Sequence, residues 1–268
     1  MKSNSTSKSV SKKKASGGML ETVKTIVYAV LIALVVRTVA YEPFNIPSGS
    51  MIPTLLVGDY LFVSKFTYGY SRYSLPFGLP LFSGRIYLPF SRLPERGDVV
   101  VFKLPTDPST DYIKRIVGLP GDHIQVRHGD LYINDQLVPR KEDQSCIDKE
   151  AGPFIVQLGY RESLPRGSGG GSVQHCIIKE FGFGGREDGP LDNTPVYDVP
   201  ADHYFAMGDN RDNSQDSRVL SAVGYIPNEN LVGQAQFIFF STDGSAHWWE
   251  VWKWPFAIRY SRLFRGVS

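Results

Sequence analysis

The apolar run Thr25–Val36 constrains the fold of this chain most, because it contains no charged side chain. Glu21 and Lys24 precede the run and Arg37 follows it. A helix needs about 20 residues to cross a bilayer. The window 19–41 reaches that length if Lys24 and Arg37 extend their side chains to opposite interfaces. The sequence therefore predicts a single transmembrane helix near the N-terminus.

Two other interpretations of this segment stay open. A short uncharged run also suits a buried helix or the core of a signal sequence. Thr38-Val39-Ala40 has the small residues of a signal-peptide cleavage site. The adjacent Arg37 and the lack of a clean break before the next domain speak against cleavage there.

Residues 1–18 form a basic tail without an acidic residue, and its lysines are Lys2, Lys8, Lys12, Lys13 and Lys14. A segment this rich in Ser, Lys and Gly is expected to be disordered. Lysines before a span predict that the N-terminus stays in the cytoplasm and that the rest is exported. Nucleic-acid binding is the alternative for the tail. No aromatic residues separate the lysines and the net charge is only +2, so we expect no nucleic-acid partner.

Short stretches rich in β-branched and aromatic residues follow the span, at 60–64, 98–103, 112–117, 123–127 and 130–134. Such stretches, bounded by Gly, Pro and Asp, are typical of β-strands. Gly-Asp pairs such as Gly58-Asp59 and Gly97-Asp98 lie where a turn would lead into a strand. We therefore predict a mainly β fold.

The strand pattern breaks down at 136–195, where the glycine-rich stretches 166–172 and 182–189 indicate flexible loops. The 268 residues allow one large domain with an insertion. The predicted parts are a tail 1–18, a transmembrane helix 19–41, a main β domain made of 42–135 and 196–245, an inserted loop-rich β subdomain 136–195, and an aromatic and basic C-terminal segment 246–268.

Aromatic residues gather in two places, between Tyr68 and Arg92 and in the C-terminal segment, where Trp248, Trp249, Trp252 and Trp254 lie near Lys253, Arg259, Arg262 and Arg265. Aromatic and basic clusters favour the headgroup region of a membrane. Ordinary packing onto a sheet is the alternative. Pro255 and the scattered charges exclude a second spanning helix at the C-terminus.

Cys146 and Cys176 lie in the predicted exported part, where a disulfide can persist, although two unpaired thiols remain the alternative. Two cysteines are too few for a structural zinc site, and the histidines lack a metal-binding spacing. The Asp-rich stretch 209–218 does not fit a calcium loop, because Ser217 and Val223 replace its turn glycine and final glutamate. We predict no metal and no cofactor.

Three motifs carry candidate chemistry: Ser48-Gly49-Ser50-Met51 just after the span, the stretch 111–122, and the polar stretch 208–218. In this order they resemble the type I signal peptidases, the bacterial leader peptidases. The resemblance covers residues 41–131 and 196–233 well and the segment between them poorly. In that family a second, smaller β domain occupies the interval of the insertion, and the main β domain is catalytic.

The resemblance implies that Ser50 is the acylated nucleophile and Lys114 its general base, with Ser214 orienting Lys114. The Ser48 hydroxyl and the Ser50 N–H would form the oxyanion hole. Strand alternation gives a physical reason for the base, because it places Tyr112 and Ile116 on the same face as Lys114. Apolar surroundings disfavour the charged amine and lower its pKa.

A histidine base is the usual alternative to a lysine. None of the five histidines lies in a motif that ties it to Ser50. The resemblance also implies apolar substrate pockets lined by Ile46, Leu55, Leu61, Val101, Tyr112 and Ile113. It assigns structural roles near the site to Arg115, Asp216 and Arg218.

The predicted function is a membrane-bound serine endopeptidase that removes signal peptides from exported preproteins after an Ala-X-Ala type site. The resemblance implies a bacterial plasma membrane location, with the catalytic domain on the outer face and preproteins and the lipid bilayer as partners. The sequence leaves the oligomeric state open, and we expect a monomer. The alternatives are another Ser/Lys hydrolase of related fold, such as a self-cleaving repressor-type protease, and an inactive membrane-tethered peptide-binding module.

Overall fold

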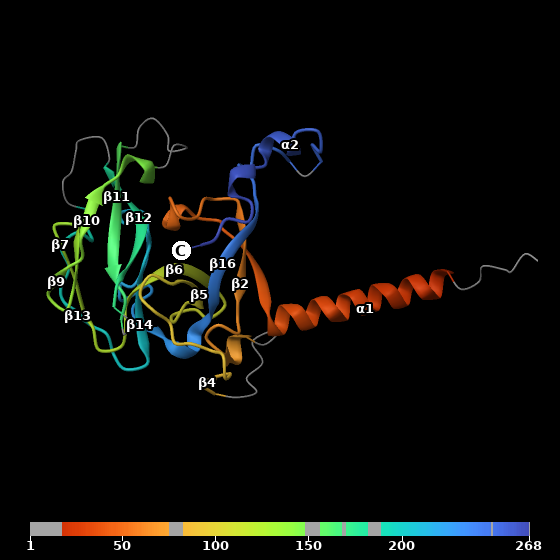
Figure 1. The fold of residues 1–268 in the computed structure, drawn as a ribbon, viewed down its shortest axis with the longest axis horizontal. Coiled ribbons are helices and arrows are strands. Elements are labelled where there is room, and N and C mark those ends of the chain that lie inside the picture. The colour runs from red at the N-terminus through yellow and green to blue at the C-terminus, as the bar shows by residue number, and fades with distance from the viewer. Residues whose placement is uncertain are drawn as a thin grey trace, which may run out of the picture.

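A computed structural model describes residues 18–74, 83–147, 156–167, 170–181, 189–247 and 249–267. The predicted tail before residue 18 and the glycine-rich stretch 182–188 lie outside these residues, as do Phe77, Phe82 and Trp248 of the aromatic clusters. A β-rich body carries one long helix that extends away from it (Figure 1).

The helix α1, Gly18–Val39, matches the predicted transmembrane segment, which ends two residues later at residue 41. Its window Met19–Val39 has a mean hydropathy of 2.0, and none of that window is buried against the rest of the protein. A long apolar helix without a protein partner suits a lipid environment better than water. The predicted single apolar span is therefore present as a helix of sufficient length.

The main sheet is antiparallel, with the strand order β1-β2-β16-β5-β6-β14-β15 among the described residues. Its strands are β1 Tyr41–Asn45, β2 Asp59–Ser64, β5 Val99–Lys103, β6 Asp111–Gly118, β14 His203–Met207, β15 Ile226–Pro227 and β16 Leu231–Ser241. Strand β6 lies between β5 and β14, so a side chain on its inner face is held on both sides.

Three smaller sheets complete the described part: β13-β7-β8-β9, β10-β11-β12 and β3-β4. Their strands are β3 Tyr70–Ser71, β4 Arg85–Ile86, β7 His123–Arg127, β8 Asp130–Ile133, β9 Gln136–Leu137, β10 Arg140–Glu142, β11 Val156–Pro165, β12 Ser172–Phe181 and β13 Tyr197–Asp198. The short helices are η1 Gly49–Met51, η2 Arg72–Ser74, η4 Gln144–Cys146, η5 Asn228–Asn230, α2 Trp254–Ala257 and η6 Tyr260–Arg262.

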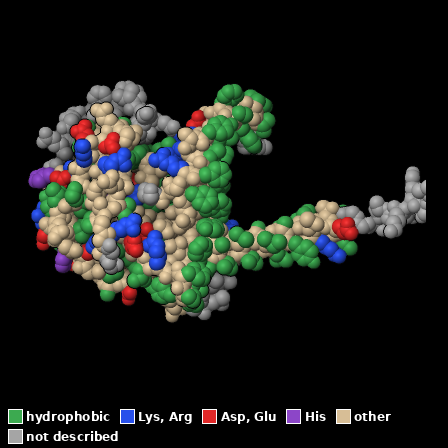
Figure 2. Space-filling view, viewed as in Figure 1, with side chains coloured by type: hydrophobic (Ala, Val, Ile, Leu, Met, Phe, Trp, Pro, Cys, Tyr) green, Lys and Arg blue, Asp and Glu red, His purple; other side chains and the backbone are tan. Residues whose placement is uncertain are grey.

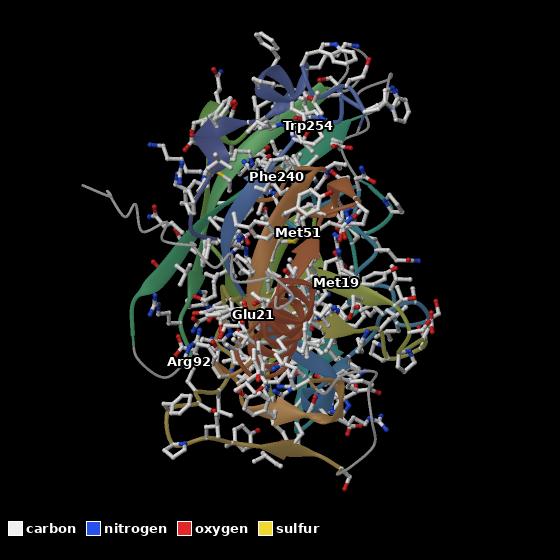
Figure 3. The ribbon with its side chains drawn as sticks, turned by 90° about the vertical axis from the view of Figure 1, so that its right-hand side faces the viewer. Met19, Glu21, Met51, Arg92, Phe240 and Trp254 are labelled. Carbon is white, nitrogen blue, oxygen red and sulfur yellow. A yellow bond between two sulfur atoms is a disulfide. The ribbon has the colours of Figure 1, made fainter. Side chains whose placement is uncertain are left out.

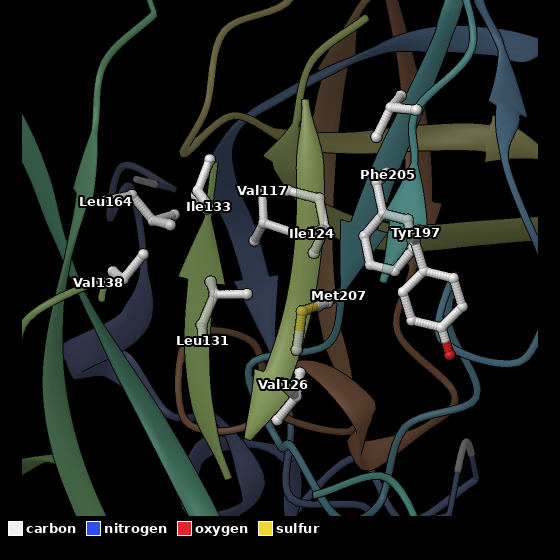
Figure 4. Close-up of a cluster of buried hydrophobic side chains, with 11 residues drawn as sticks. Val117, Ile124, Val126, Leu131, Ile133, Val138, Leu164, Tyr197, Phe205 and Met207 are labelled. Atoms are coloured by element: carbon white, nitrogen blue, oxygen red, sulfur yellow. The ribbon is translucent and has the colours of Figure 1, made fainter. Parts of the chain in front are cut away.

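A buried apolar cluster joins the main sheet to the β7–β8 sheet (Figure 4). Val117 of β6 and Phe205 of β14 pack there against Ile124 and Leu131, and all four are at most 1% exposed. Burying a large apolar side chain contributes about 1.5–3 kcal/mol. A second buried apolar cluster contains Met51, the last residue of the Ser48–Met51 motif. Its other members are Ile46, Leu55, Leu61, Val63, Val99, Val101, Val232, Ala235 and Ile238.

In the predicted loop-rich β subdomain, β11 and β12 form a long antiparallel hairpin, which the sequence did not indicate as strands. The side chains of Glu162, His175 and Lys179 are buried in this hairpin. Because these charged residues occupy buried positions, the two strands lack the alternation of apolar and polar residues from which a strand is predicted. Cys146 in η4 and Cys176 in β12 form a disulfide.

These strands confirm the predicted mainly β fold with an inserted smaller β part and one preceding apolar helix. The strands predicted at 60–64, 98–103, 112–117, 123–127 and 130–134 correspond to β2, β5, β6, β7 and β8. The glycines of the two Gly-Asp pairs named above, Gly58 and Gly97, have φ of 90° and 96°. Glycine tolerates this left-handed conformation, as the turn interpretation requires.

Candidate active site

Ser50 lies in the short helix η1, which follows β1 and is fixed to the core by the fully buried Met51. Ser50 itself is only 8% exposed. As a residue of the first turn, Ser50 has no partner for its N–H within the helix. Its carbonyl oxygen accepts a hydrogen bond from the Asn210 N–H, at 3.1 Å. The 208–218 stretch, which we call the polar loop, therefore holds the backbone of Ser50 directly.

Lys114 lies on β6, and its Nζ is 2.7 Å from Ser50 Oγ. The amine also donates to the Ile113 carbonyl oxygen, at 2.9 Å. Its Nζ is 5.2 Å from the centre of the Tyr112 ring, in agreement with the shared face that strand alternation predicts. Ser50 and Lys114 are therefore in hydrogen-bond contact across a sequence separation of 64 residues.

The surroundings of Lys114 lower the pKa of its amine. Lys114 is 3% exposed, and burial lowers the pKa of its amine from 10.5 to about 8. The carboxylates of Asp216 and Asp209 oppose this shift, whereas the positive charge of Arg218 adds to it. Desolvation outweighs the two acidic groups because neither forms an ion pair with the amine. A neutral amine beside a hydroxyl can accept its proton near pH 7.

Ser48 and Ser214 lie on two sides of this pair. Ser48 Oγ is 3.5 Å from Ser50 Oγ, at the limit of a hydrogen bond. Ser214 is packed against Gly208, since a Cβ placed on that glycine would lie 2.2 Å from Ser214 Oγ and 2.5 Å from the Ser50 carbonyl oxygen. The expected hydrogen bond from Ser214 to Lys114 is absent among the described residues. The buried Ser214 hydroxyl is close enough to Asp216 to stabilise its carboxylate instead.

Arg115, the neighbour of Lys114, forms a buried two-point ion pair with Asp209, at 2.8 and 2.7 Å. Burial opposes ionisation of Asp209, but Arg115 outweighs it, so the pKa of this carboxyl is lowered. Arg218 binds Asp216 in the same two-point manner, at 2.8 Å on each side. Asp216 also accepts the Gly208 N–H, at 3.0 Å. The Arg115–Asp209 pair therefore holds the polar loop against β6, and the Arg218–Asp216 pair fixes the loop internally.

A cavity of about 510 Å³ opens beside Ser50 and Lys114. It is lined by residues 44–50, by residues 110–114, and by Val101, Asn213 and Gln215. Four of the six expected pocket residues lie here, namely Ile46, Val101, Tyr112 and Ile113. Leu55 and Leu61 differ from the expectation. Both are fully buried in the cluster around Met51, because an apolar residue near the motif suits the core as well as a pocket.

Two residues of the polar loop were given no role from the sequence, although they line the cavity. Asn213 and Gln215 both reach it, and Gln215 Oε1 accepts a hydrogen bond from the Tyr112 hydroxyl, at 3.0 Å. Their only signal in the sequence was membership of the motif, which does not tell a lining side chain from a bracing one.

None of the five histidines, all of them described, lines this cavity. His175 is the buried one, and its Nε2 lies 3.4 Å from Glu162 and 3.9 Å from Asp209. Burial, with a contribution from Arg115, lowers the pKa of His175 to about 4. The basic group in contact with Ser50 is therefore a lysine.

Most of the chain is similar to proteins of one family. The sequence model of the family described as "Signal peptidase, peptidase S26" matches residues 19–240. A Signal peptidase I of Rickettsia typhi is 43% identical over 253 residues, which is 90% of each chain. A Signal peptidase I of Rickettsia canadensis is 42% identical over 257 residues, 91% of this chain and 92% of that one.

A crystal structure of a signal peptidase I from Enterococcus faecalis V583 covers 53% of this chain and 97% of its own, with 23% identity and a TM-score of 0.30. A TM-score of 0.30 is too low to support a conclusion about the fold. The family model and the two relatives span most of the chain. The chain therefore belongs to the signal peptidase family, peptidase S26, and is a serine endopeptidase.

Proposed function

We propose that this chain is a membrane-anchored peptidase that removes N-terminal signal peptides from exported preproteins, with Ser50 and Lys114 as a catalytic dyad. The observation that carries the proposal is the 2.7 Å contact between Lys114 Nζ and Ser50 Oγ, two buried residues that line one cavity. The family membership and the names of the two relatives support the choice of substrate.

In the first step the neutral Lys114 amine takes the Ser50 proton while Ser50 Oγ bonds to the scissile carbonyl carbon. With a pKa of about 8, about one tenth of the amines are neutral at pH 7. The resulting ammonium then gives its proton to the departing amine, and the C–N bond breaks. An acyl-enzyme ester on Ser50 remains. Lys114 next takes a proton from water, whose oxygen attacks the ester carbon. The ester C–O bond then breaks, the carboxylic acid leaves, and the Lys114 ammonium returns its proton to Ser50 Oγ.

The negatively charged oxygen of each tetrahedral intermediate is stabilised by hydrogen-bond donors. The Ser50 N–H, which has no partner within η1, and the Ser48 hydroxyl, 3.5 Å from Ser50 Oγ, are suitably near for this role. Loss of one such hydrogen-bond donor typically lowers the catalytic rate by about 100-fold to 1000-fold. Ser48 would turn its hydroxyl from Ser50 toward the oxyanion once substrate is bound.

Ser214 would hold the neutral Lys114 amine in place. A neutral amine has one lone pair and two N–H groups. In the neutral state the lone pair would accept the Ser50 hydroxyl across the 2.7 Å contact. One N–H is donated to the Ile113 carbonyl oxygen, which leaves one N–H for Ser214 Oγ. The position of Ser214 Oγ beside Gly208 and near the Ser50 carbonyl oxygen supports this role. Catalytic hydrogen bonds are often loose without substrate and tighten when it binds.

Substrate would bind as an extended segment between residues 44–50 and residues 110–114. Strand β1 is an edge of the main sheet, and β14 pairs with β6 only from Arg115 onward. The first half of β6 therefore has free backbone groups that an added strand can use. Ile46, Val101 and Ile113 give the cavity an apolar lining, which favours small apolar side chains on either side of an Ala-X-Ala junction.

We place α1 across the bacterial plasma membrane with the N-terminus in the cytoplasm and the β body on the outer face. Hydrophobic side chains cover α1 and α2 and the edge of the body between them (Figure 2). Figure 3 looks at this side, from which α1 projects toward the viewer, with Phe240 and Trp254 above it. Trp252, Trp254 and Phe256 are exposed, as suits contact with lipid headgroups.

The test is cleavage of a synthetic preprotein with an Ala-X-Ala junction by the full chain in detergent. Wild type should cut at the junction, and Ser50→Ala and Lys114→Met should abolish cleavage. Ser172→Ala and Lys141→Met are matched controls at exposed positions outside the cavity and should keep wild-type rates. Cleavage that survives Lys114→Met would assign the base to another group. No cleavage by folded wild type would favour a peptide-binding module.

A further inference from the structure

The inserted hairpin is hydrogen-bonded to the polar loop through the backbone. The Ile178 N–H of β12 donates to the Asp209 carbonyl oxygen, at 2.9 Å, and the Arg211 N–H donates to the Ile178 carbonyl oxygen, at 3.0 Å. Ile178 and Asn210 thus form a parallel bridge. Residues 209–211 therefore lie along β12, at the edge of the β10-β11-β12 sheet. Backbone hydrogen bonds thus connect the insertion to the polar loop.

A side chain of the same strand holds Asn210 more tightly. Glu180 Oε1 accepts a hydrogen bond from Asn210 Nδ2, at 2.7 Å, and another from Gln157 Nε2 of β11, at 3.2 Å. The Glu180 N–H donates to Asp212 Oδ2, at 2.9 Å. The two strands of the hairpin therefore both contribute to the position of the Asn210 side chain.

Asn210 links this hairpin to the nucleophile. Its own N–H donates to the Ser50 carbonyl oxygen, at 3.1 Å, and the residue is fully buried. A single residue thus separates Glu180 of the insertion from the backbone of Ser50. A displacement of Asn210 is expected to move Ser50 Oγ relative to Lys114 Nζ.

A buried ion pair makes a second connection. Arg211 of the polar loop binds both carboxylate oxygens of Glu162 on β11, one of them at 2.9 Å. The Arg211 carbonyl oxygen accepts a hydrogen bond from Arg218, at 2.6 Å, and Arg218 in turn binds Asp216. Both residues of the Arg211–Glu162 pair are at most 3% exposed, so water does not compete for these bonds.

We infer that the inserted hairpin is a positioning element of the active site and that Glu180 is a positioning residue, acting through Asn210 on Ser50. The inference rests on the proposed function and deepens it, because it gives the insertion a part in the same reaction. A misplacement of about 1 Å costs a reaction of this kind about 100-fold. Glu180 is only half-buried, at the rim of the hairpin, so its replacement leaves the apolar clusters untouched.

The test compares full-length variants in detergent with the same synthetic preprotein. Glu180→Ala removes the acceptor for Asn210, and kcat should fall about tenfold with KM unchanged. Glu180→Gln keeps a side-chain oxygen in the same place, so kcat should stay within about twofold of wild type. Glu142→Ala, an exposed residue on β10 of the same sheet, is the control and should have no effect. The Tm of each variant is measured alongside.

A double-mutant cycle identifies the route. Asn210→Ala removes the amide that Glu180 binds but keeps the backbone N–H to Ser50. If Glu180 acts through Asn210, the double variant should be no slower than the slower single variant. The inference is overturned if Glu180→Ala keeps wild-type kcat, if Gln and Ala are equally slow, or if the two effects multiply. Failure of wild type to cleave would instead reject the proposed function, and the inference with it.

Discussion

Three lysines in different parts of this protein are equally buried and differ in what surrounds the amine. Lys65, Lys114 and Lys179 are each 3% exposed. Lys65 pairs with Glu42 at 2.9 Å, and Lys179 pairs with Asp192 at 2.5 Å. Among the described residues no carboxylate forms an ion pair with Lys114, and burial lowers its pKa to about 8. Burial without a counter-ion, rather than burial itself, thus distinguishes a general base from a structural cation.

The largest effect is expected from one substitution made at two of these sites. Arginine stays charged at any working pH, so it can replace a paired lysine but not a base. Lys114→Arg should lower kcat/KM by about 1000-fold or more, since a general base contributes up to about 10,000-fold. Lys65→Arg keeps the ion pair with Glu42 and should stay within about threefold. Both are measured on the synthetic preprotein, and an active Lys114→Arg enzyme would remove Lys114 from the dyad.

The second prediction removes a counter-ion. Asp192→Asn removes the carboxylate that pairs with the buried Lys179 ammonium at 2.5 Å, which should destabilise the fold by about 3–5 kcal/mol. Denaturant unfolding of the detergent-solubilised protein measures this loss. Asp135→Asn is the control, because its side chain is 83% exposed and its ion pair with Arg127 is worth little. Equal stability of the two variants would contradict a structural role for the Lys179 pair.

Local sequence could predict the elements of this fold but not the partners of its buried charges. Alternation correctly placed Tyr112 on the Lys114 face of β6. Lys179 follows two apolar residues in much the same way, yet it is an ion-pair residue, because Asp192 reaches it from outside the strand. An apolar pattern around a lysine indicates that the lysine is buried. It does not indicate whether a carboxylate from a distant segment pairs with that lysine in the folded protein.

The same limit applies to the turns and the pocket. The Gly-Asp pairs were read as turns, and the positive φ of Gly58 agrees with this interpretation. The sequence could not show that Asp59 also binds Arg262 across 203 residues. Leu55 and Leu61 have the same apolar character as Ile46, but only Ile46 reaches the cavity. Which side of a sheet faces the substrate depends on strand order, which a local pattern does not contain.

The third prediction concerns the stability cost of a neutral lysine. The folded pKa of Lys114, about 8, is below the value of 10.5 for the unfolded chain. The unfolded chain therefore binds more protons between pH 8 and 10.5, and stability rises with pH across that window. Lys114→Met should stabilise the protein at pH 7 by about 1–3 kcal/mol, with a smaller gain at pH 10.

Lys65→Met is the matched comparison and should have the opposite sign. It leaves the Glu42 carboxylate, which is 16% exposed, without its lysine partner. Denaturant unfolding of both variants at pH 7 and pH 10 separates the two kinds of site. A destabilised Lys114→Met protein would mean that the amine contributes more through its hydrogen bonds to Ser50 and Ile113 than its burial costs.

The smallest effect is the dependence of cleavage on pH. Deprotonation of Lys114 creates the base, so kcat/KM, which reports the pKa of the free enzyme, should rise with pH and level off above the pKa of about 8. The neutral fraction grows from about one tenth at pH 7 to about nine tenths at pH 9, which predicts an increase of about tenfold. Lys65→Arg should leave this midpoint unchanged, because Lys65 already has its counter-ion. A midpoint near 6.5 would instead indicate a histidine of ordinary pKa, and a flat profile would mean that proton transfer does not limit the rate.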